Sequence, residues 1–337
     1  MIIVMRYGAS EEDILRVIEQ VERSGCEAHL DRGVERTIIG VRSGRHDLSP
    51  ESFQRLPGVA DAVRILKPYK LASREFHPSF TRIGLGRFEI NEASFGVIAG
   101  PCSVESREQI TETAKAVKAA GAHALRGGAF KPRSSPYAFQ GFGEEGLKWL
   151  LCAGQEAELP VVTEVMHPGN IEMVARYADV LQIGARNMQN YDLLKEVASV
   201  GKPVFLKRGM AARVEDLLLS AEYLLDGGCG QVILCERGIR TFETATRNTM
   251  DIAAVPVLKK LTHLPVFVDP SHAAGYSDYV MPLALAAAAA GADGIMVEVH
   301  PNPAEARSDG PQSLTFPSFA ELMESCRRVA QVVGRQV

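Results

Sequence analysis

FGVIAGPCSVESREQITETAKAVKAAGAHALRGG, residues 95–128, contains a short apolar run, a loop, a long helical pattern and a second apolar run. Short runs of this kind are typical of parallel strands that are buried on both faces. The same order of strand, loop and helix occurs eight times between residue 95 and the end of the chain. The eight apolar runs are FGVIAG, HALRGG, PVVTEV, DVLQIG, PVFLKR, QVILCE, PVFVDP and GIMVEV. The sequence therefore predicts an α/β fold in which residues 95–337 form a (β/α)8 TIM barrel.

An open, doubly wound sheet is the alternative fold for this alternation of strands and helices. Such sheets usually carry a GxGxxG turn after their first strand, where it binds phosphate. The first apolar run of this chain is instead followed by GPCSVES. This difference favours the barrel.

A smaller domain precedes the barrel. Residues 1–66 contain strand and helix patterns in the order β-α-β-β-α-β, which is the ferredoxin-like arrangement. Its first helix follows Ser10 as N-cap and ends at Gly25. Residues 67–94 are predicted to be a linker and a β-hairpin, because prolines lie near both ends of 67–80 and a glycine turn follows.

The composition is that of an ordinary soluble globular protein. The 337 residues have a hydrophobic fraction of 46% and a formal net charge of −4. This slightly acidic balance argues against nucleic acid or a membrane surface as a partner, since both attract basic patches. No signal-peptide pattern is apparent, and the six cysteines show no paired spacing. We therefore expect a cytoplasmic protein with reduced thiols.

Cationic side chains follow four of the predicted strands. In a barrel, the loops after the strands form one rim, which carries the active site. Arg126, Arg186, Lys207 and Arg237 stand at the ends of strands 2, 4, 5 and 6, and strand 2 leads into KPRSS at 131–135. Arg fits phosphate or carboxylate with its planar fork, and Lys supplies a point charge. The pattern predicts an anion-binding site, unless the cations pair with neighbouring acids.

A second group of side chains offers metal ligands. Cys102, His272 and Glu298 stand at the ends of strands 1, 7 and 8, which barrel closure makes neighbours. Asp309, in the loop after strand 8, could complete a set of four. Mixed sulfur, nitrogen and oxygen donors suit Zn²⁺, Mn²⁺, Fe²⁺ or Co²⁺. Two alternatives remain: these residues could be buried for structural reasons, and His300 could replace a ligand because it lies two residues from Glu298.

Seven longer motifs cover the strand ends in order. They are GPCSVES, LRGGAFKPRSSPYAFQG, IGARNMQN, LKRGM, CERGIRTFE, VDPSHAAG and EVHPNPAEARSDGPQSL. Together they resemble the 3-deoxy-D-arabino-heptulosonate 7-phosphate (DAHP) synthases of the type I beta class, and the resemblance covers nearly the whole chain. It implies a transferase that condenses phosphoenolpyruvate with erythrose 4-phosphate. That reaction is the first step of aromatic amino-acid synthesis by the shikimate pathway, and the family requires one divalent metal ion.

The resemblance also implies roles for individual residues. The metal ligands would be Cys102, His272, Glu298 and Asp309. Phosphoenolpyruvate would be bound by Arg126, Lys131, Ala185, Arg186, Lys207 and Arg237. Erythrose 4-phosphate would be bound by Pro132, Arg133 and Ser134, although the family commonly has KPRT where this chain has KPRS.

The chemistry of such a condensation suggests two further roles. The enol carbon C3 must attack the aldehyde of the sugar, and a metal can polarise that carbonyl as a Lewis acid. Water then adds at C2 and phosphate leaves. Lys131 is the candidate proton donor, and Glu164 is the candidate for handling the water.

Two rival functions and one regulatory role stay open. A 3-deoxy-D-manno-octulosonate 8-phosphate synthase uses the same enol donor with arabinose 5-phosphate, but typically carries KANRSS where this chain has KPRSS. A non-catalytic barrel that senses a phosphorylated metabolite is the other rival. The domain over 1–66 resembles the regulatory domain of some DAHP synthases, which binds an aromatic amino acid such as tyrosine or phenylalanine. Its alternative role is contact between subunits, since the family forms homotetramers.

Overall fold

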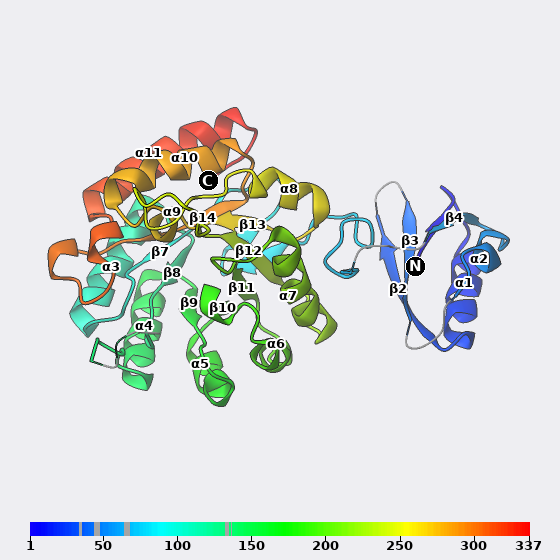
Figure 1. The fold of residues 1–337 in the computed structure, drawn as a ribbon, viewed down its shortest axis with the longest axis horizontal. Helices are drawn as coiled ribbons and strands as arrows, with labels where there is room; N and C mark the ends of the chain where they lie inside the picture. Colours follow the sequence, from blue (N-terminus) through cyan, green and yellow to red (C-terminus); the bar gives the residue numbers. More distant parts are fainter. Residues whose placement is uncertain (34–35, 44–47, 64–67, 132–134, 136) are drawn as a thin grey trace. The chain divides into compact units, whose positions relative to one another are not determined.

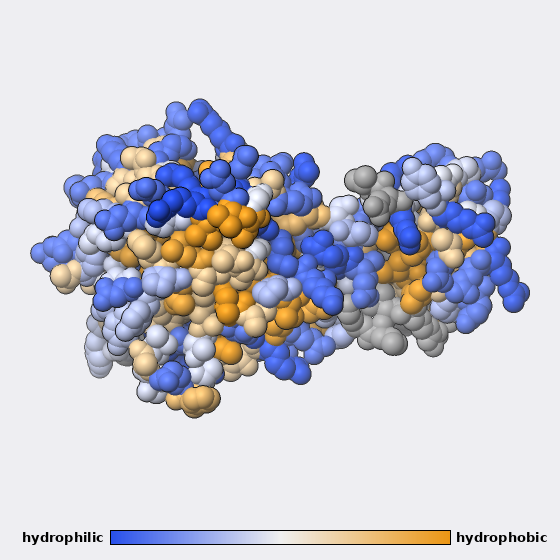
Figure 2. Space-filling model, turned by 90° about the horizontal axis from the view of Figure 1, so that it is seen from above, coloured by the Kyte–Doolittle hydropathy of each residue, from blue (hydrophilic) through white to orange (hydrophobic). Residues whose placement is uncertain are grey.

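The computed structural model describes the chain except residues 34–35, 44–47, 64–67, 132–134 and 136, and it describes residues 42–43 by their backbone alone. It divides into two compact units (Figure 1). Unit 1 contains Met1–Ser79 and Leu261–His263, and unit 2 contains Phe80–Lys260 and Leu264–Val337. On the face visible in Figure 2, hydrophilic side chains cover much of each unit, while apolar side chains gather near the middle of unit 2.

Unit 1 contains an antiparallel sheet with the strand order β2-β3-β1-β4 and two helices, which confirms the predicted ferredoxin-like fold. Its elements are β1 (Ile2–Met5), α1 (Glu11–Arg23), β2 (Cys26–Arg32), β3 (Thr37–Ser43), α2 (Glu51–Gln54) and β4 (Val59–Val63). The Ser10 side chain accepts a hydrogen bond from the backbone N–H of Asp13 and so caps α1. Ile14, Val17 and Val21 lie on one face of α1 and are buried in the core shared with the sheet.

The other face of this sheet is covered by residues 68–79, part of the segment predicted as a linker. Phe76 is buried against Ile2 and Ile38 of the sheet. Gly40 of β3 makes this packing possible, because a Cβ atom there would lie 2.1 Å from the Phe76 ring. The predicted hairpin, β5 (Ile83–Leu85) and β6 (Phe88–Ile90), belongs to unit 2.

Unit 2 is a closed barrel of eight parallel strands surrounded by helices, as predicted. The strands are β7 (Gly96–Gly100), β8 (Ala124–Arg126), β9 (Val161–Glu164), β10 (Val180–Ile183), β11 (Val204–Lys207), β12 (Val232–Glu236), β13 (Val266–Val268) and β14 (Gly294–Glu298). The α-helices are α3 (Arg107–Ala120), α4 (Glu144–Ala157), α5 (Ile171–Tyr177), α6 (Tyr191–Ala198), α7 (Val214–Asp226), α8 (Ala254–Leu261), α9 (Pro270–Ala274), α10 (Ser277–Ala289) and α11 (Phe316–Val332). Short 3-10 helices are η1 (Pro168–Asn170), η2 (Ala185–Asn187), η3 (Pro303–Glu305) and η4 (Gly310–Gln312). Pairing of β14 with β7 closes the barrel.

The barrel interior is filled by apolar side chains from all eight strands. These residues are Ile98, Ala124, Val162, Val180, Phe205, Ile233, Cys235, Phe267 and Met296. The hairpin β5–β6 adds Ile83, Leu85 and Ile90 to the same cluster. Because the interior is packed, only the loops at the strand ends are left to form a site. No helix among the described residues is long and apolar enough to cross a membrane.

His123 ties the hairpin to the start of the strands. Its Nδ1 accepts a hydrogen bond of 3.0 Å from the backbone N–H of Val97, and its ring stacks on Phe88 at a centroid distance of 3.7 Å. Burial lowers the pKa of His123 to about 4, and the cations of Arg327 and Lys118 contribute. The folded barrel therefore holds His123 in its neutral form. Its contribution to stability is present above the unfolded pKa, near 6.5, and is lost as the pH falls towards 4.

We expect the substitution His123→Gln to flatten the pH dependence of barrel stability between pH 6.5 and pH 4. The amide does not titrate in this range and can still accept the Val97 hydrogen bond. A shift of this size corresponds to a loss of about 2 to 3 kcal/mol across the range in the unmodified protein. Urea unfolding at several pH values, followed by fluorescence of Trp149 in α4, measures the effect on the barrel alone. An unchanged pH dependence in the variant contradicts the assignment.

Candidate active site

The ends of the barrel strands enclose one polar pocket. Its lining consists mainly of charged side chains and backbone from the loops after the strands. These residues are Arg126, Lys131, Glu164, Gln182, Gly184, Ala185, Arg186, Lys207, Met210, Arg237, Arg247, His272 and Asp309. The structure thus brings together every predicted phosphoenolpyruvate residue and two of the predicted metal ligands at one pocket.

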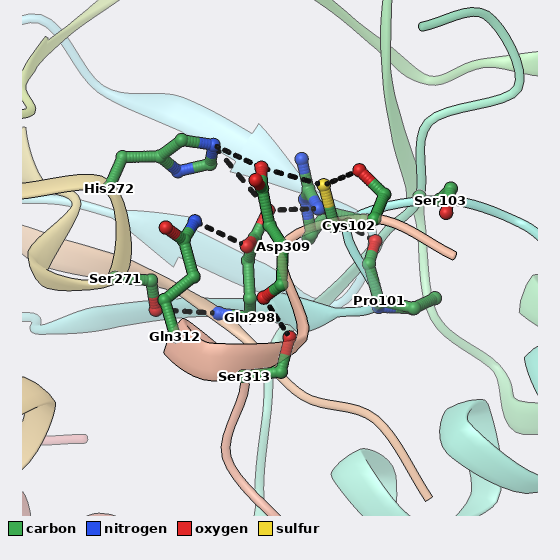
Figure 3. A network of polar contacts seen from close by, with 12 residues as sticks. Pro101, Cys102, Ser103, Ser271, His272, Glu298, Asp309, Gln312 and Ser313 are labelled. Carbon is green, nitrogen blue, oxygen red and sulfur yellow. Dashed lines mark hydrogen bonds and ion pairs between the residues drawn. The ribbon is translucent and has the colours of Figure 1, made fainter. Parts of the chain in front are cut away.

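The four predicted metal ligands lie together beside this pocket (Figure 3). Ligand atoms of Cys102, Glu298 and Asp309 all lie within 4.8 Å of one another, and Cys102 Sγ is 3.2 Å from Asp309 Oδ2. His272 Nε2 lies 3.5 Å from Glu298 Oε1 and 3.9 Å from Asp309 Oδ2. Cys102 lies in the loop after β7 and Glu298 at the end of β14. Asp309 is the N-cap of η4, and His272 lies in helix α9.

The imidazole and the Asp309 carboxylate of this cluster are in the forms that bind a cation, whereas the Cys102 thiol is not ionised. Burial lowers the pKa of His272, which leaves its ring neutral and able to offer a nitrogen lone pair. Burial acts to raise the pKa of Asp309, but His272 and Arg247 outweigh it and lower that pKa to about 2. Burial raises the pKa of the Cys102 thiol to about 12, with Glu298 adding to the effect. One sulfur, one imidazole and two carboxylates in this arrangement fit a divalent metal, whose charge would favour the thiolate.

The backbone at the end of β7 allows this arrangement. Gly100 has φ +152°, and a Cβ atom at this position would lie 2.0 Å from the carbonyl oxygen of Arg126. The close approach of the two strand ends brings Cys102 beside the residues that follow β8. Arg126 also donates hydrogen bonds to the carbonyl oxygen of Pro101 (2.6 Å) and to Glu298 (3.0 Å). The metal-side and anion-side residues are therefore in direct contact.

The cations of the pocket differ in how they are paired. Arg126 binds Glu298, Lys207 binds Asp269, and Lys131 Nζ lies 2.9 Å from Cys102 Sγ. Arg186 and Arg237, in contrast, have no carboxylate within ion-pair distance among the residues that the structure describes. Arg237 is only 5% exposed. Arg186 is exposed and solvated, whereas a buried cation such as Arg237 without a carboxylate favours an anion from outside the chain.

Arg126 also points to an anionic ligand. Its Nε is buried and has no hydrogen-bond partner among the described residues. A buried donor without a partner costs free energy, so its retention beside the pocket indicates a ligand acceptor. Arg208 is the counterexample: it binds Glu236 and Asp251 at 2.8 Å each and does not line the pocket.

Glu164 lies at the end of β9 and lines the pocket. Gln182 donates a hydrogen bond of 3.4 Å to its carboxylate. Gly184 leaves room for that carboxylate, because a Cβ atom there would lie 2.1 Å from Glu164 Oε1. Glu164 can therefore approach whatever the neighbouring Ala185 and Arg186 bind.

Four predicted residues are not among those that the structure brings to the site. The predicted sugar-phosphate ligands Pro132, Arg133 and Ser134 are outside the described residues. His300, the alternative metal ligand, instead lies 3.5 Å from Glu105 and is not part of the ligand cluster.

Sequence reasoning missed three residues that hold the ligands in place. Asp269 binds both His272 and Lys207. Gln312 donates a hydrogen bond of 2.6 Å to Glu298, and Arg247 reaches both Gln312 and Asp309. The spacing of Asp269 three residues before His272 is the N-cap pattern of a helix, so it was a usable signal for the first of these. Nothing local in the sequence points to Gln312 or Arg247.

Comparison with known proteins extends this picture. Residues 87–332 match the DAHP synthetase I family, and residues 1–67 match the DAHP synthase ferredoxin-like domain. The chain is 51% identical over 337 residues to phospho-2-dehydro-3-deoxyheptonate aldolase from Thermotoga maritima, with 100% of both chains covered. It is 34% identical over 259 residues to 2-dehydro-3-deoxyphosphooctonate aldolase from Fusobacterium nucleatum, covering 71% of this chain and 91% of that one.

Solved structures agree with the sequence comparison. A crystal structure of the Thermotoga maritima DAHP synthase aligns with a TM-score of 0.80 at 50% identity, covering 100% of this chain and 98% of that one. A truncated form of the same enzyme aligns with a TM-score of 0.75 and covers 80% of this chain. With both parts of the chain matched, this protein belongs to the DAHP synthase family that carries a ferredoxin-like domain at its N-terminus.

Proposed function

We propose that this protein is a metal-dependent DAHP synthase, which condenses phosphoenolpyruvate with erythrose 4-phosphate and water to give DAHP and phosphate. Membership of the family supports the reaction class. The observation that carries the substrate assignment is the group of under-paired cations beside a set of metal ligands. Phosphoenolpyruvate offers both a carboxylate and a phosphate to such a group, and erythrose 4-phosphate offers a second phosphate.

Phosphoenolpyruvate would bind on the anion side of the pocket. Among the described residues, Arg126, Arg186 and Arg237 present donors without full partners, and Lys207 adds a positive charge. The backbone of Ala185, at the start of η2, would contribute an N–H group to the phosphate. Binding at several points would hold the enol in one orientation and expose one face of C3 to the aldehyde.

The metal would be held by Cys102, His272, Glu298 and Asp309. When bound, it supplies Lewis-acid polarisation of the aldehyde carbonyl. The sugar phosphate would be received by the segment that follows Lys131, namely Pro132, Arg133 and Ser134. This assignment rests on the resemblance of the KPRSS motif at 131–135 to that of the family, and the three residues lie outside the described part of the chain.

Two residues of the chain would move protons. Lys131 would donate a proton, since its ammonium group lines the pocket and also lies 2.9 Å from Cys102 Sγ. Burial opposes its charge, but Cys102 and Glu298 favour it, so that the pKa of Lys131 lies above the ordinary value. Glu164 would orient the water that adds at C2, after which phosphate is released.

An assay of phosphate release tests the reaction and its rivals. We expect release from phosphoenolpyruvate with erythrose 4-phosphate and a divalent metal, and loss of activity after treatment with a chelator. Arabinose 5-phosphate in place of erythrose 4-phosphate should give a much lower rate. A preference for arabinose 5-phosphate would instead support the octulosonate synthase activity, which the name of the Fusobacterium relative suggests. Absence of release with either sugar would favour a sensing barrel.

Replacement of Lys131 by methionine tests the proton donor. Methionine keeps much of the bulk and removes the charge, so we expect kcat to fall by about 10² to 10⁴-fold, with a smaller change in KM for phosphoenolpyruvate. Lys148→Met is a suitable control, because Lys148 is an exposed residue of the neighbouring helix α4. Retained turnover in Lys131→Met rules out this role.

The ferredoxin-like domain would bind an aromatic amino acid and inhibit the enzyme. Its match to a domain of this family supports the proposal, and inhibition requires that the ligand bind two states of the protein with different affinities. A homotetramer would be the working form. The apolar side chains that gather on one face of unit 2 in Figure 2 are a surface suited to such contacts.

Deletion of residues 1–66 is expected to abolish inhibition by tyrosine or phenylalanine and to leave the barrel active. A second deletion, of residues 1–79, controls for the apolar segment around Phe76, which packs on the sheet of unit 1. Initial rates with and without each amino acid measure the effect. Indifference of the intact protein to both amino acids would remove the regulatory proposal.

A further inference from the structure

A single buried carboxylate joins the two halves of the pocket. Asp269 follows β13, caps helix α9 and has no exposed surface. Its Oδ1 accepts a hydrogen bond of 2.9 Å from the backbone N–H of His272. Its Oδ2 lies 2.7 Å from His272 Nδ1 and also accepts a hydrogen bond from Lys207 Nζ. One oxygen atom is thus shared by a metal-side imidazole and an anion-side ammonium.

On the metal side, Asp269 sets the orientation of His272. A carboxylate beside Nδ1 holds the proton on that nitrogen, so the lone pair lies on Nε2. Nε2 is the atom that faces Glu298 and Asp309, at 3.5 Å and 3.9 Å. The backbone contact from the same carboxylate fixes the start of α9 and limits rotation of the imidazole.

On the anion side, Asp269 neutralises Lys207. The Lys207 side chain is 5% exposed, and Asp269 is the one carboxylate within 4.0 Å of its Nζ in the described part of the chain. The same ammonium lines the pocket with Arg186 and Arg237. An anion in the pocket would therefore compete with Asp269 for the charge of Lys207.

From this shared contact we propose that Asp269 is a positioning residue that couples metal binding to phosphoenolpyruvate binding. The inference rests on the proposed function. When the enol phosphate draws Lys207 towards itself, Oδ2 is left to the imidazole, which becomes a better metal ligand at Nε2. Since coupling between two bound ligands is reciprocal, the metal would raise the affinity for phosphoenolpyruvate by the same factor. Asp269 itself touches neither the metal nor the substrate.

Zn²⁺ affinity, measured by competition with a chromogenic chelator, tests the coupling when determined with and without saturating phosphoenolpyruvate. In the unmodified protein we expect phosphoenolpyruvate to tighten Zn²⁺ binding by about 5-fold or more. Asp269→Asn should weaken Zn²⁺ binding by about 10 to 100-fold without phosphoenolpyruvate. It should also lose most of the tightening. Direct attraction between metal and anion would survive this substitution, so the experiment separates the two causes.

Lys207→Gln tests the other end of the contact. This variant leaves Asp269 and His272 intact, so Zn²⁺ affinity without phosphoenolpyruvate should stay within about threefold of the unmodified protein or increase. The tightening by phosphoenolpyruvate should be lost. Because this variant does not disturb the cap of α9, it carries the test if Asp269→Asn does not fold.

Asp293→Asn is the matched control. Asp293 is also fully buried and also binds a lysine, Lys259, at 2.6 Å and a backbone N–H, that of Val266, at 2.7 Å. It lies before the N-terminal end of β14, at the opposite end of the barrel from the pocket. Its replacement should lower stability while leaving Zn²⁺ affinity and the tightening unchanged.

Three outcomes overturn the inference. One is Zn²⁺ binding by Asp269→Asn within about twofold of the unmodified protein. Another is full tightening by phosphoenolpyruvate in Asp269→Asn or Lys207→Gln. The third is an equal loss of both properties in Asp293→Asn, which would indicate a general effect of a buried charge. If the unmodified protein bound neither Zn²⁺ nor phosphoenolpyruvate, the proposed function would fail and this inference with it.

Discussion

The pairing of β14 with β7 is the constraint on which the site depends. In this parallel register Glu298 lies opposite Gly100, although almost 200 positions separate them in the chain. Closure brings the loop that carries Cys102 beside the end of the strand that carries Glu298. It also brings Arg126, on the next strand, within 3.0 Å of Glu298. Without this closure the ligands of the metal side and the first cation of the anion side would have no common location.

Charge balance explains why the pocket is stable without being neutral. The barrel mouth buries several cations and carboxylates, and most of them are joined in pairs such as Arg126–Glu298 and Lys207–Asp269. A buried ion that lacks a partner is costly, so the pairs hold the site together. Arg237 is the exception, since it is buried without a carboxylate partner in the described structure. The fold therefore keeps part of its positive charge available for a ligand.

The sequence predicted those features whose cause is local or repeats along the chain. Short, continuous apolar runs identified parallel strands that are buried on both faces. The helix patterns between these runs identified the barrel. The order of strand ends then placed Cys102, His272 and Glu298 together, because barrel closure is a property of the fold class. His300 illustrates the limit of this reasoning. His300 lies two residues after Glu298, so the alternation of a strand predicted that both side chains face the same side. The structure places His300 beyond the end of β14, with its ring 3.5 Å from Glu105.

What the sequence by itself determined is the pair of folds and the chemical types of side chain at each strand end, since both follow from short-range patterns. Tertiary structure alone decided which of those charges satisfy one another. The shared oxygen of Asp269, the bond from Gln312 to Glu298 and the packing of Phe76 on Gly40 all join residues from separate segments of the chain. Contacts of this kind depend on differences of a few tenths of an ångström in the positions of packed elements. Sequence spacing carries no information at that precision, and the folded barrel does.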